Sequence, residues 1–448
     1  MALTVKQKLG FGIFDLGGNL LFTALGFWSL NYLTDTVGLT AALAGAAVMI
    51  GKFWDAVTDP LMGYISDRTN SRWGRRRPYL LFGAIPLFLT MTFFFIKPDY
   101  LASGGVLNPV VLTIWAVIAL MLLNTASTVI NIPYSSLTPE LTGDYHERTS
   151  LNGYRFGCAV FGTIIGAAAV QPIVGAFPTR KAGFIAVGIL LGGIVAVTTL
   201  LTFFGTKERP HKKEDVPTKG FFTTYREVFT NKPYVILFVT YALHLCAITF
   251  LQGILVYYTK YIYANEALAT PAMVALLLVA MVFIPISVLV AKKIGKKSVY
   301  QICFLILGSA CLLIFFFGHT IGQNFFLGIM FYAGIGLGFS YVAPFAMVPD
   351  AVEYDAVKTG ERKEGAYYGI WTFIAKVGQS FAVFLSGLIL SAGGYAADAV
   401  QSAGSLFAIR LIIGPIPAVI FAAAVIVIQF YPLDEKTYNR LVKADRHG

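Results

Sequence analysis

The chain has few charged residues for its length. Only 13% of its 448 residues are Asp, Glu, Lys or Arg, whereas an ordinary soluble domain has about 25%. Hydrophobic residues make up 57%, and 37 residues are Phe. A water-soluble protein of this size cannot hide so much apolar surface in a core. The composition therefore excludes a soluble protein and indicates an integral membrane protein.

Cysteine and nucleotide-binding motifs are also scarce or missing. The four cysteines lie inside apolar runs without C-x-x-C spacing, which argues against a disulfide framework or a cysteine metal site. No Walker motif occurs, so we expect energy from an ion gradient and no cofactor besides a coupling cation. The N-terminus has no small-residue cleavage signature, so we expect no removed signal peptide.

Twelve apolar stretches are each long enough to cross about 30 Å of hydrocarbon as a helix. The sequence therefore predicts an all-α membrane protein. The expected spans are at about 10–32, 41–66, 79–97, 108–132, 151–177, 182–205, 233–263, 270–291, 298–318, 324–348, 366–391 and 405–431.

One long polar stretch divides six spans from six. The expected domains are an N-terminal bundle at 1–205, a cytoplasmic linker at 206–232, a C-terminal bundle at 233–431 and a cytoplasmic tail at 432–448. The halves also repeat, since PYSSLTPELTGDYHERTSLNGYRFG follows the fourth span and PFAMVPDAVEYDAVKTGERKEGAYYG follows the tenth. Two six-helix bundles with a parallel internal repeat are the sequence form of the major facilitator architecture, whose substrate site lies between the halves.

The basic residues are distributed unevenly across the membrane. Of 34 Lys and Arg, only four fall on the side opposite the termini. These four are Lys97, Arg180, Lys181 and Lys260. Because cytoplasmic loops are enriched in basic residues, we expect both termini in the cytoplasm, with the chain in the cell (inner) membrane. The same bias accounts for the net charge of +11 without a nucleic-acid partner.

Two acids lie inside the second span, in KFWDAVTDP. Asp55 and Asp59 are four residues apart and share a helical face, with Thr58 beside them. Carboxylates inside a membrane are costly and mark function. Together they form an oxygen-rich Na⁺ site or, with one carboxyl protonated, a proton site. The alternative is an ion pair with Lys52, three residues before Asp55. We favour the cation site, in which Asp55 and Asp59 are the metal ligands if the ion is Na⁺.

Polar residues recur at helical spacing on other spans. A single Asn or Thr often serves only as an interhelical hydrogen bond, whereas a mid-span Lys is harder to explain by packing. The residues are Asp15, Asn19 and Thr23 on the first span, Asn124, Thr128 and Asn131 on the fourth, Arg155 on the fifth and Lys376 on the eleventh.

Charged residues of both signs gather at the cytoplasmic ends of the spans. We expect Asp67, Arg75, Glu140 and Asp350 to take part in a salt-bridge network between the halves that closes the inner face. The alternative is that these charges only set topology and contact lipid headgroups.

Three segments resemble one family nearly end to end along the chain. WDAVTDPLMGYISDRTNSRWGRRRPY, INIPYSSLTPELTGDYHERTSLNGYRF and MVPDAVEYDAVKTGERKEGAYYGIW are similar to the glycoside–pentoside–hexuronide:cation symporters, the melibiose-permease-like members of the major facilitator superfamily. The resemblance implies that Asp55 and Asp59 bind the coupling cation together with Thr128. It also implies that Arg155 and Lys376 contact the sugar.

The chain departs from the melibiose-type pattern at several positions. Asn19 and Asn131 replace two sugar-binding Asp, Ser135 replaces an aromatic sugar platform, and Thr58 replaces an Asn of the cation site. Asp15, one turn before Asn19, is placed to take over part of the lost role. The departures leave open both the solute and the choice between Na⁺ and H⁺.

We therefore expect a symporter that couples Na⁺ or H⁺ to a sugar or glycoside, works as a monomer and is no enzyme. A cation-coupled lysophospholipid carrier is the alternative, and a non-transporting sensor or enzyme is a distant one. The mid-depth charges, three basic and three acidic, leave one positive charge in excess once a cation binds. An acidic sugar such as a uronide is therefore slightly favoured over a neutral glycoside.

Overall fold

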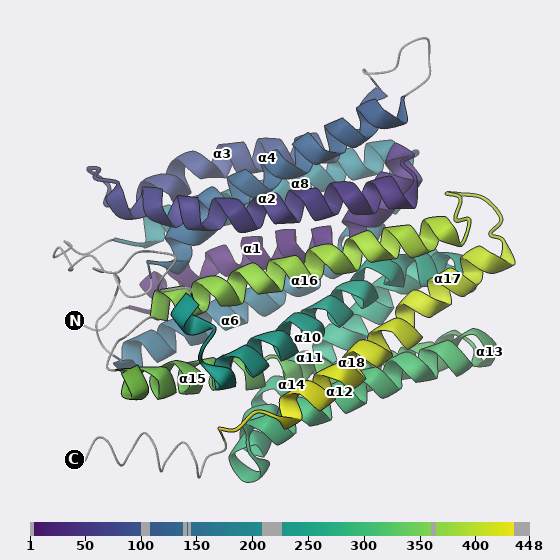
Figure 1. The fold of residues 1–448 in the computed structure, drawn as a ribbon. Helices are drawn as coiled ribbons and strands as arrows, with labels where there is room; N and C mark the ends of the chain where they lie inside the picture. Colours follow the sequence, from purple (N-terminus) through teal and green to yellow (C-terminus); the bar gives the residue numbers. More distant parts are fainter. Residues whose placement is uncertain are drawn as a thin grey trace. The chain divides into compact units, whose positions relative to one another are not determined.

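The computed structural model describes residues 4–99, 108–137, 141, 145–207, 226–359 and 364–433. Helices dominate this part of the chain and no strand occurs in it (Figure 1). The α-helices are α1 (Val5–Asn31), α2 (Ala41–Arg68), α3 (Arg77–Phe94), α4 (Pro109–Ser135), α6 (Tyr145–Ala168), α7 (Val170–Gly175), α8 (Arg180–Gly205), α10 (Lys232–Tyr257), α11 (Ala269–Ile294), α12 (Lys296–Leu313), α13 (His319–Ile321), α14 (Gln323–Ser340), α15 (Ala343–Thr359), α16 (Glu364–Ala392), α17 (Ala403–Ile413) and α18 (Pro415–Gln429).

The helices start where the sequence supplies polar caps. Thr4, Thr40, Asn108, Thr179 and Asn231 each precede a helix, and the side chain of each accepts a hydrogen bond from a backbone N–H of the first turn. Such caps satisfy donors that have no partner inside the helix. They are needed most at a membrane boundary, where the apolar run begins and backbone groups lose water.

Twelve helical segments among the described residues are long and apolar enough to cross a membrane. The predicted all-α chain with twelve spans is confirmed. The tenth span is longer than expected, since it continues to Thr359 rather than ending near 348. It breaks at Tyr341 and Val342, just before Pro344, and resumes as α15. A proline is tolerated in the first turn of the resumed helix, which explains why the chain continues as a helix.

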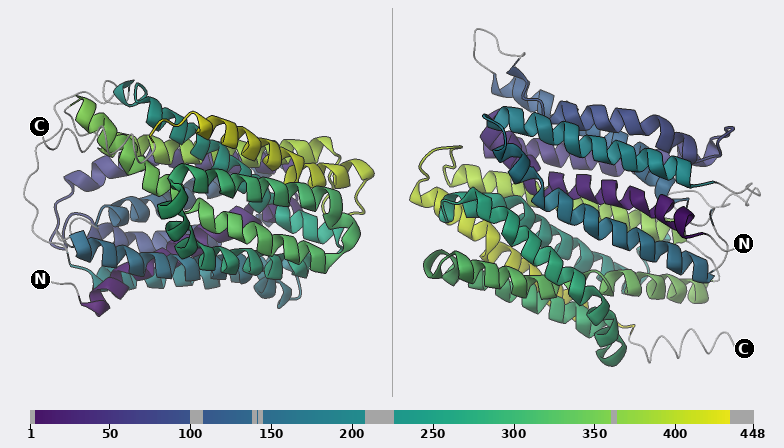
Figure 2. Two further views of the ribbon diagram at one scale, coloured as in Figure 1. Left: turned by 90° about the horizontal axis from the view of Figure 1, so that it is seen from below. Right: turned by 180° about the vertical axis from the view of Figure 1, so that it is seen from behind.

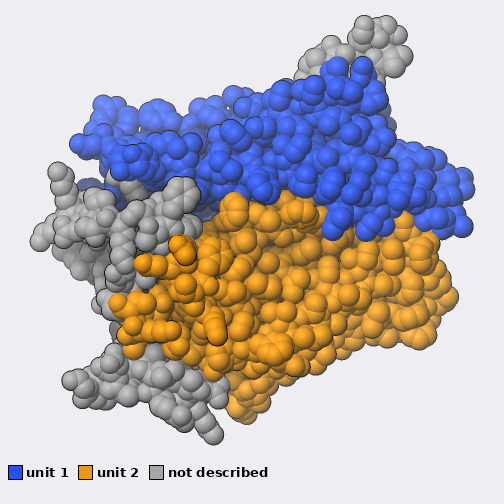
Figure 3. Space-filling model, in the orientation of Figure 1, with its two compact units in different colours: residues 1–214, 383–405 blue, residues 215–382, 406–448 orange. Residues whose placement is uncertain are grey.

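The chain divides into two compact units (Figure 3). One comprises residues 1–214 and 383–405, and the other comprises residues 215–382 and 406–448. Within each unit the helices run alongside one another (Figure 2). In the first unit, α1 packs on α6 and α8, α2 on α4, and α3 on α4 and α8.

The second unit repeats this packing. Helix α10 packs on α18, α11 on α14, and α12 on α14 and α18. Counted by span, these four pairs match α1 with α8, α2 with α4, α3 with α4 and α3 with α8. The parallel repeat seen in the sequence therefore recurs in four of the five helix pairs named for the first unit.

Glycines allow α6 to lie close against α1. A Cβ on Gly162 would lie 2.0 Å from the Leu16 carbonyl oxygen, and one on Gly166 would lie 2.4 Å from the Leu20 carbonyl oxygen. Both distances are too short for any side chain. Small residues four apart let helix backbones approach closely in a membrane. This packing fixes the height of α6 relative to α1.

Prolines interrupt the hydrogen-bond ladders of α2 and α4. Pro60 lies inside α2, directly after Asp59, and Pro133 lies near the end of α4. Each lacks the N–H that would bond to the carbonyl four residues earlier. Both helices nevertheless continue past the proline.

Candidate functional site

The two acids of α2 meet a hydroxyl of α4. The Thr128 Oγ1 atom lies 2.6 Å from Asp55 Oδ1 and 3.0 Å from Asp59 Oδ1. Thr128 is buried and the two acids are half-buried. Two of the four predicted cation ligands, Asp55 and Asp59, therefore lie within hydrogen-bond distance of a third, Thr128. The hydroxyl of the fourth, Thr58, donates to the Asp55 backbone carbonyl of its own helix.

Small and amide side chains bring α2 and α4 to this separation. A Cβ on Gly51 would lie 2.8 Å from Leu120 Cβ, so only glycine fits here without a shift. The Asn124 amide donates to the Gly51 carbonyl oxygen over 2.8 Å. Asn124 stands one turn before Thr128. The contact therefore fixes the height at which the Thr128 hydroxyl faces the acids.

The single hydroxyl proton of Thr128 limits the hydrogen bonds that it can donate to the two acids. A hydroxyl has one proton and can donate it to only one carboxylate at full strength. The second short oxygen–oxygen approach is repulsive unless that carboxyl carries a proton or a cation shares the oxygens. Carboxylate and hydroxyl oxygens are also the ligands that hard cations prefer. The arrangement therefore suits a site that holds one proton or one hard cation.

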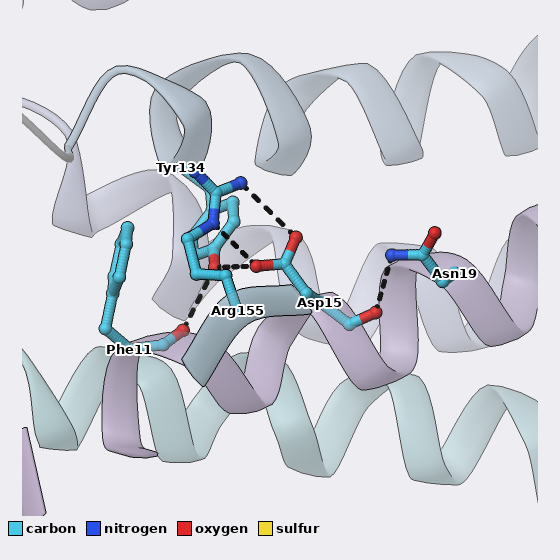
Figure 4. A network of polar contacts seen from close by, with 5 residues as sticks. All are labelled: Phe11, Asp15, Asn19, Tyr134 and Arg155. Carbon is cyan, nitrogen blue, oxygen red and sulfur yellow. Dashed lines mark hydrogen bonds and ion pairs between the residues drawn. The ribbon is translucent and has the colours of Figure 1, made fainter. Parts of the chain in front are cut away.

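A second network joins α1, α4 and α6 (Figure 4). The Arg155 guanidinium approaches both oxygens of Asp15, with Nε 2.7 Å from Oδ2 and Nη2 3.3 Å from Oδ1. The Tyr134 hydroxyl lies 2.5 Å from Asp15 Oδ2 and 3.1 Å from the Phe11 carbonyl oxygen. The side chains of Arg155 and Asp15 remain 23% and 15% exposed. Asp15 and Arg155 thus neutralise each other's charge, and both side chains remain accessible to a small molecule.

Aromatic rings hold this network in place. The Tyr134 ring is buried and packs against Phe11 and Phe14, with ring centroids 4.7 and 4.2 Å apart. The guanidinium carbon of Arg155 lies 4.8 Å from the Tyr134 ring centroid and 5.5 Å from that of Phe11. A guanidinium over aromatic faces is held by cation–π attraction as well as by its ion pair.

The sequence did not identify Tyr134 as a site residue. This residue extends the polar stripe of α4, because Asn124, Thr128, Asn131 and Tyr134 stand at i, i+4, i+7 and i+10. This spacing was the feature of the sequence that could have identified Tyr134. Tyr134 stands one turn after Asn131, and α4 thereby contributes a side chain to both networks.

The two Asn residues that replace family acids bond locally. The Asn19 amide donates to the Asp15 backbone carbonyl over 2.8 Å, and the Asn131 amide donates to Ser127 Oγ over 2.8 Å. A Cβ on Gly18 would lie 3.7 Å from Asn131 Oδ1, so Asn131 lies against α1. Both Asn therefore lie beside the Asp15 network, on α1 and α4.

Two further basic residues come from α2 and α16. The Lys52 ammonium is 5.8 Å from the Phe22 ring centroid, and its pairing with Asp55 stays a prediction. Lys376 lies on α16 in the second unit, where the Ser380 hydroxyl donates to its backbone carbonyl. Its role as a sugar contact also stays a prediction.

The predicted gate residues are described only in part. Arg75 lies in the connection between α2 and α3, and Asp350 lies on α15, where its Oδ2 is 2.6 Å from Lys296 Nζ of α12. That ion pair lies within the second unit. Glu140 and the side chain of Asp67 are outside the described residues. The network between the halves therefore stays a prediction.

Comparison with known proteins gives matches along nearly the whole chain. A family model described as MFS/sugar transport protein matches residues 10–435. The putative sulfoquinovose importer of Escherichia coli (strain K12) is 29% identical, over 99% of this chain and 94% of that protein. The isoprimeverose transporter of Lactiplantibacillus pentosus is 29% identical, over 96% of this chain and 89% of that protein.

The solved structures agree on the fold. The crystal structure of the nucleoside transporter NupG matches with a TM-score of 0.62, covering 95% of this chain and 99% of that one. The sequences are only 15% identical, so this likeness concerns the fold alone.

Proposed function

The chain belongs to the MFS/sugar transport protein family, and on that premise we propose that it is a secondary active symporter that couples Na⁺ or H⁺ to a sugar or glycoside. It is a multi-pass membrane protein with the twelve-helix major facilitator fold, and its relatives are transporters rather than enzymes. The resemblance to the glycoside–pentoside–hexuronide:cation symporters is thereby confirmed. Relatives named for isoprimeverose and sulfoquinovose support a sugar as the solute.

The acid pair of α2 carries the proposal of cation coupling. Asp55 and Asp59 share the hydroxyl of Thr128, whose single proton cannot serve both carboxylates. A proton or Na⁺ bound between the two carboxylates would reduce their mutual repulsion. Symport then requires the cation to raise solute affinity, and by linkage the solute raises cation affinity by the same factor.

The Asp15 network supports the solute half of the proposal. A carboxylate and a guanidinium held side by side offer acceptors and donors to vicinal sugar hydroxyls. Asp15 and Arg155 are partly exposed, and Asn19 and Asn131 lie nearby. We place the sugar against these four residues of the first unit, and a contact of the sugar with Lys376 stays a prediction of the family resemblance.

The same proposal includes the membrane orientation. We place both termini in the cytoplasm, in the cell inner membrane, from the distribution of Lys and Arg. A monomer suffices, because each bundle of the major facilitator fold is one half of a complete transport unit.

Gradient-driven uptake in proteoliposomes tests the function. Liposomes with an imposed Na⁺ or H⁺ gradient are screened with radiolabelled xylosides, glucosides and galactosides. We expect Asp59→Asn to abolish accumulation while it retains solute exchange, because the change removes the ion's binding group and leaves the solute pocket intact. Asp99→Asn is the matched control, since Asp99 is an exposed partner of Lys97 and Lys181. Accumulation by Asp59→Asn at the level of the wild type would refute the cation site.

A further inference from the structure

One of the two edges through which the Arg155 guanidinium can bind an anion with two hydrogen bonds is occupied by a residue of the chain itself. The Nε and Nη2 atoms face the two oxygens of Asp15 in the side-by-side geometry that guanidinium groups use to bind a carboxylate. A uronate or sulfonate group of a solute that approached this guanidinium would meet Asp15 and a positive charge that Asp15 already neutralises.

Contacts with Tyr134 and Phe11 hold the Asp15–Arg155 pair in position. Tyr134 contacts Asp15 Oδ2 over 2.5 Å from a ring that is 1% exposed, and the guanidinium lies over the Tyr134 and Phe11 rings. Removing Asp15 from Arg155 would leave a carboxylate in a half-buried site without its counter-charge, which is strongly unfavourable. A solute that keeps the pair intact avoids this cost.

Five charged residues of the first unit balance once a cation is bound: Asp15, Lys52, Asp55, Asp59 and Arg155. Arg155 neutralises Asp15, so Lys52 remains against Asp55 and Asp59 among the predicted site residues of this unit. One bound Na⁺ or H⁺ supplies the missing positive charge. These five residues then need no charge from the solute, and Lys376 of the second unit is outside this count.

We infer that Asp15 determines substrate charge by serving as the built-in counter-ion of Arg155, so that this site selects a neutral, hydroxyl-rich sugar over its acidic analogue. The inference rests on the proposed function and specifies its substrate class. Sugar hydroxyls donate to Asp15 and accept from Arg155 without separating the two. Asp15 is thereby a specificity residue of this site.

Paired sugars test the inference on the full-length protein. Affinities for methyl glycosides of glucose, galactose and xylose are measured beside the corresponding methyl glucuronide and galacturonide, with purified protein in nanodiscs. We expect the wild type to bind the neutral member of a pair more tightly. Asp15→Asn should raise the uronide-to-glycoside affinity ratio at least tenfold, because Arg155 then faces a neutral amide.

Two further variants separate charge from structure. Tyr134→Phe removes a hydroxyl but no charge, so its ratio should stay within threefold of the wild type. The double variant Asp15→Asn with Arg155→Gln removes both charges and should return the ratio towards the wild-type value. An unchanged ratio in Asp15→Asn, or a wild type that prefers the uronide, overturns the inference. The wild-type comparison decides even if a variant does not fold.

Failure of the proposed function gives a different result. If no sugar or uronide binds or is transported by the wild type, the solute class is wrong. If sugars are transported but Asp15→Asn does not change the protein's preference between neutral and acidic sugars, only the counter-ion role is wrong.

Discussion

Replacing the hydroxyl of Thr128 should affect the two candidate coupling ions in opposite directions. Thr128→Val keeps the shape of the side chain but removes the oxygen that lies 2.6 Å from Asp55 and 3.0 Å from Asp59. A hydroxyl that donates to a carboxylate stabilises the ionised form. A lone pair directed at Na⁺ stabilises the loaded form instead.

The magnitude for a proton follows from the hydrogen bond. A bond to a charged group is worth about 2 kcal/mol, so its loss makes the carboxyl hold its proton about 30-fold more tightly. In a proton-coupled protein, the pH midpoint of uptake should therefore rise by about 1.5 units. In a sodium-coupled protein, the lost ligand outweighs the lost hydrogen bond, and the Na⁺ concentration for half-maximal uptake should rise by about tenfold.

Uptake measured against pH and against Na⁺ in proteoliposomes distinguishes the two ions. Thr113→Val is the matched control, because Thr113 lies on the same helix and its hydroxyl donates to the Pro109 carbonyl of that helix. Uptake in Thr128→Val with unchanged dependence on both ions would show that Thr128 is not part of the coupling site. A change of equal size in Thr113→Val would assign the effect to general destabilisation of α4.

Three further predictions concern packing and orientation. Gly162→Ala should destabilise the protein by about 1–3 kcal/mol, because its Cβ would overlap the α1 backbone. Gly157→Ala is the control, since a Cβ there meets open space and should not lower the melting temperature. Equal melting temperatures of the two variants would contradict the packing. Tyr395→Phe removes the hydroxyl that lies 2.5 Å from Asp35 Oδ1, so amide hydrogen exchange in the loop at residues 393–402 should accelerate. Unchanged protection from exchange would mean that this hydrogen bond does not hold the loop. A cysteine in place of Lys181 should react with an impermeant maleimide added outside intact cells, and labelling only after permeabilisation would reverse the proposed orientation.

The sequence predicted the spans well because hydrocarbon thickness constrains them directly. A helix needs about 20 apolar residues to cross, and this requirement does not depend on tertiary contacts. Where prolines interrupt the pattern, the prediction was less accurate. The tenth span was expected to end near 348, but the chain resumes as α15 and remains helical to Thr359. Composition alone does not tell whether a proline ends a helix or opens its next segment.

Helical periodicity predicted part of the candidate sites, and the family resemblance supplied Thr128 as the partner of the two acids. The i, i+4 spacing puts Asp55 and Asp59 on one face, but which α4 side chain meets them depends on the packing of the two helices. Thr58 stands beside the acids in sequence, yet its hydroxyl bonds to its own helix, as Ser and Thr often do. Tyr134 was overlooked because an aromatic residue in an apolar helix ordinarily indicates packing.

The prolines of α2 and α4 have a mechanical consequence. Pro60 leaves the Ala56 carbonyl without its helical donor, and Pro133 does the same for Val129. Both interruptions adjoin the acid pair and Thr128, so each helix is least stiff where it would have to tighten around an ion. A compliant site can contract on one ion and reopen at small elastic cost. Pro133 also lies between Thr128 and Tyr134, so a bend there would transmit movement at the acid pair to the Asp15 network.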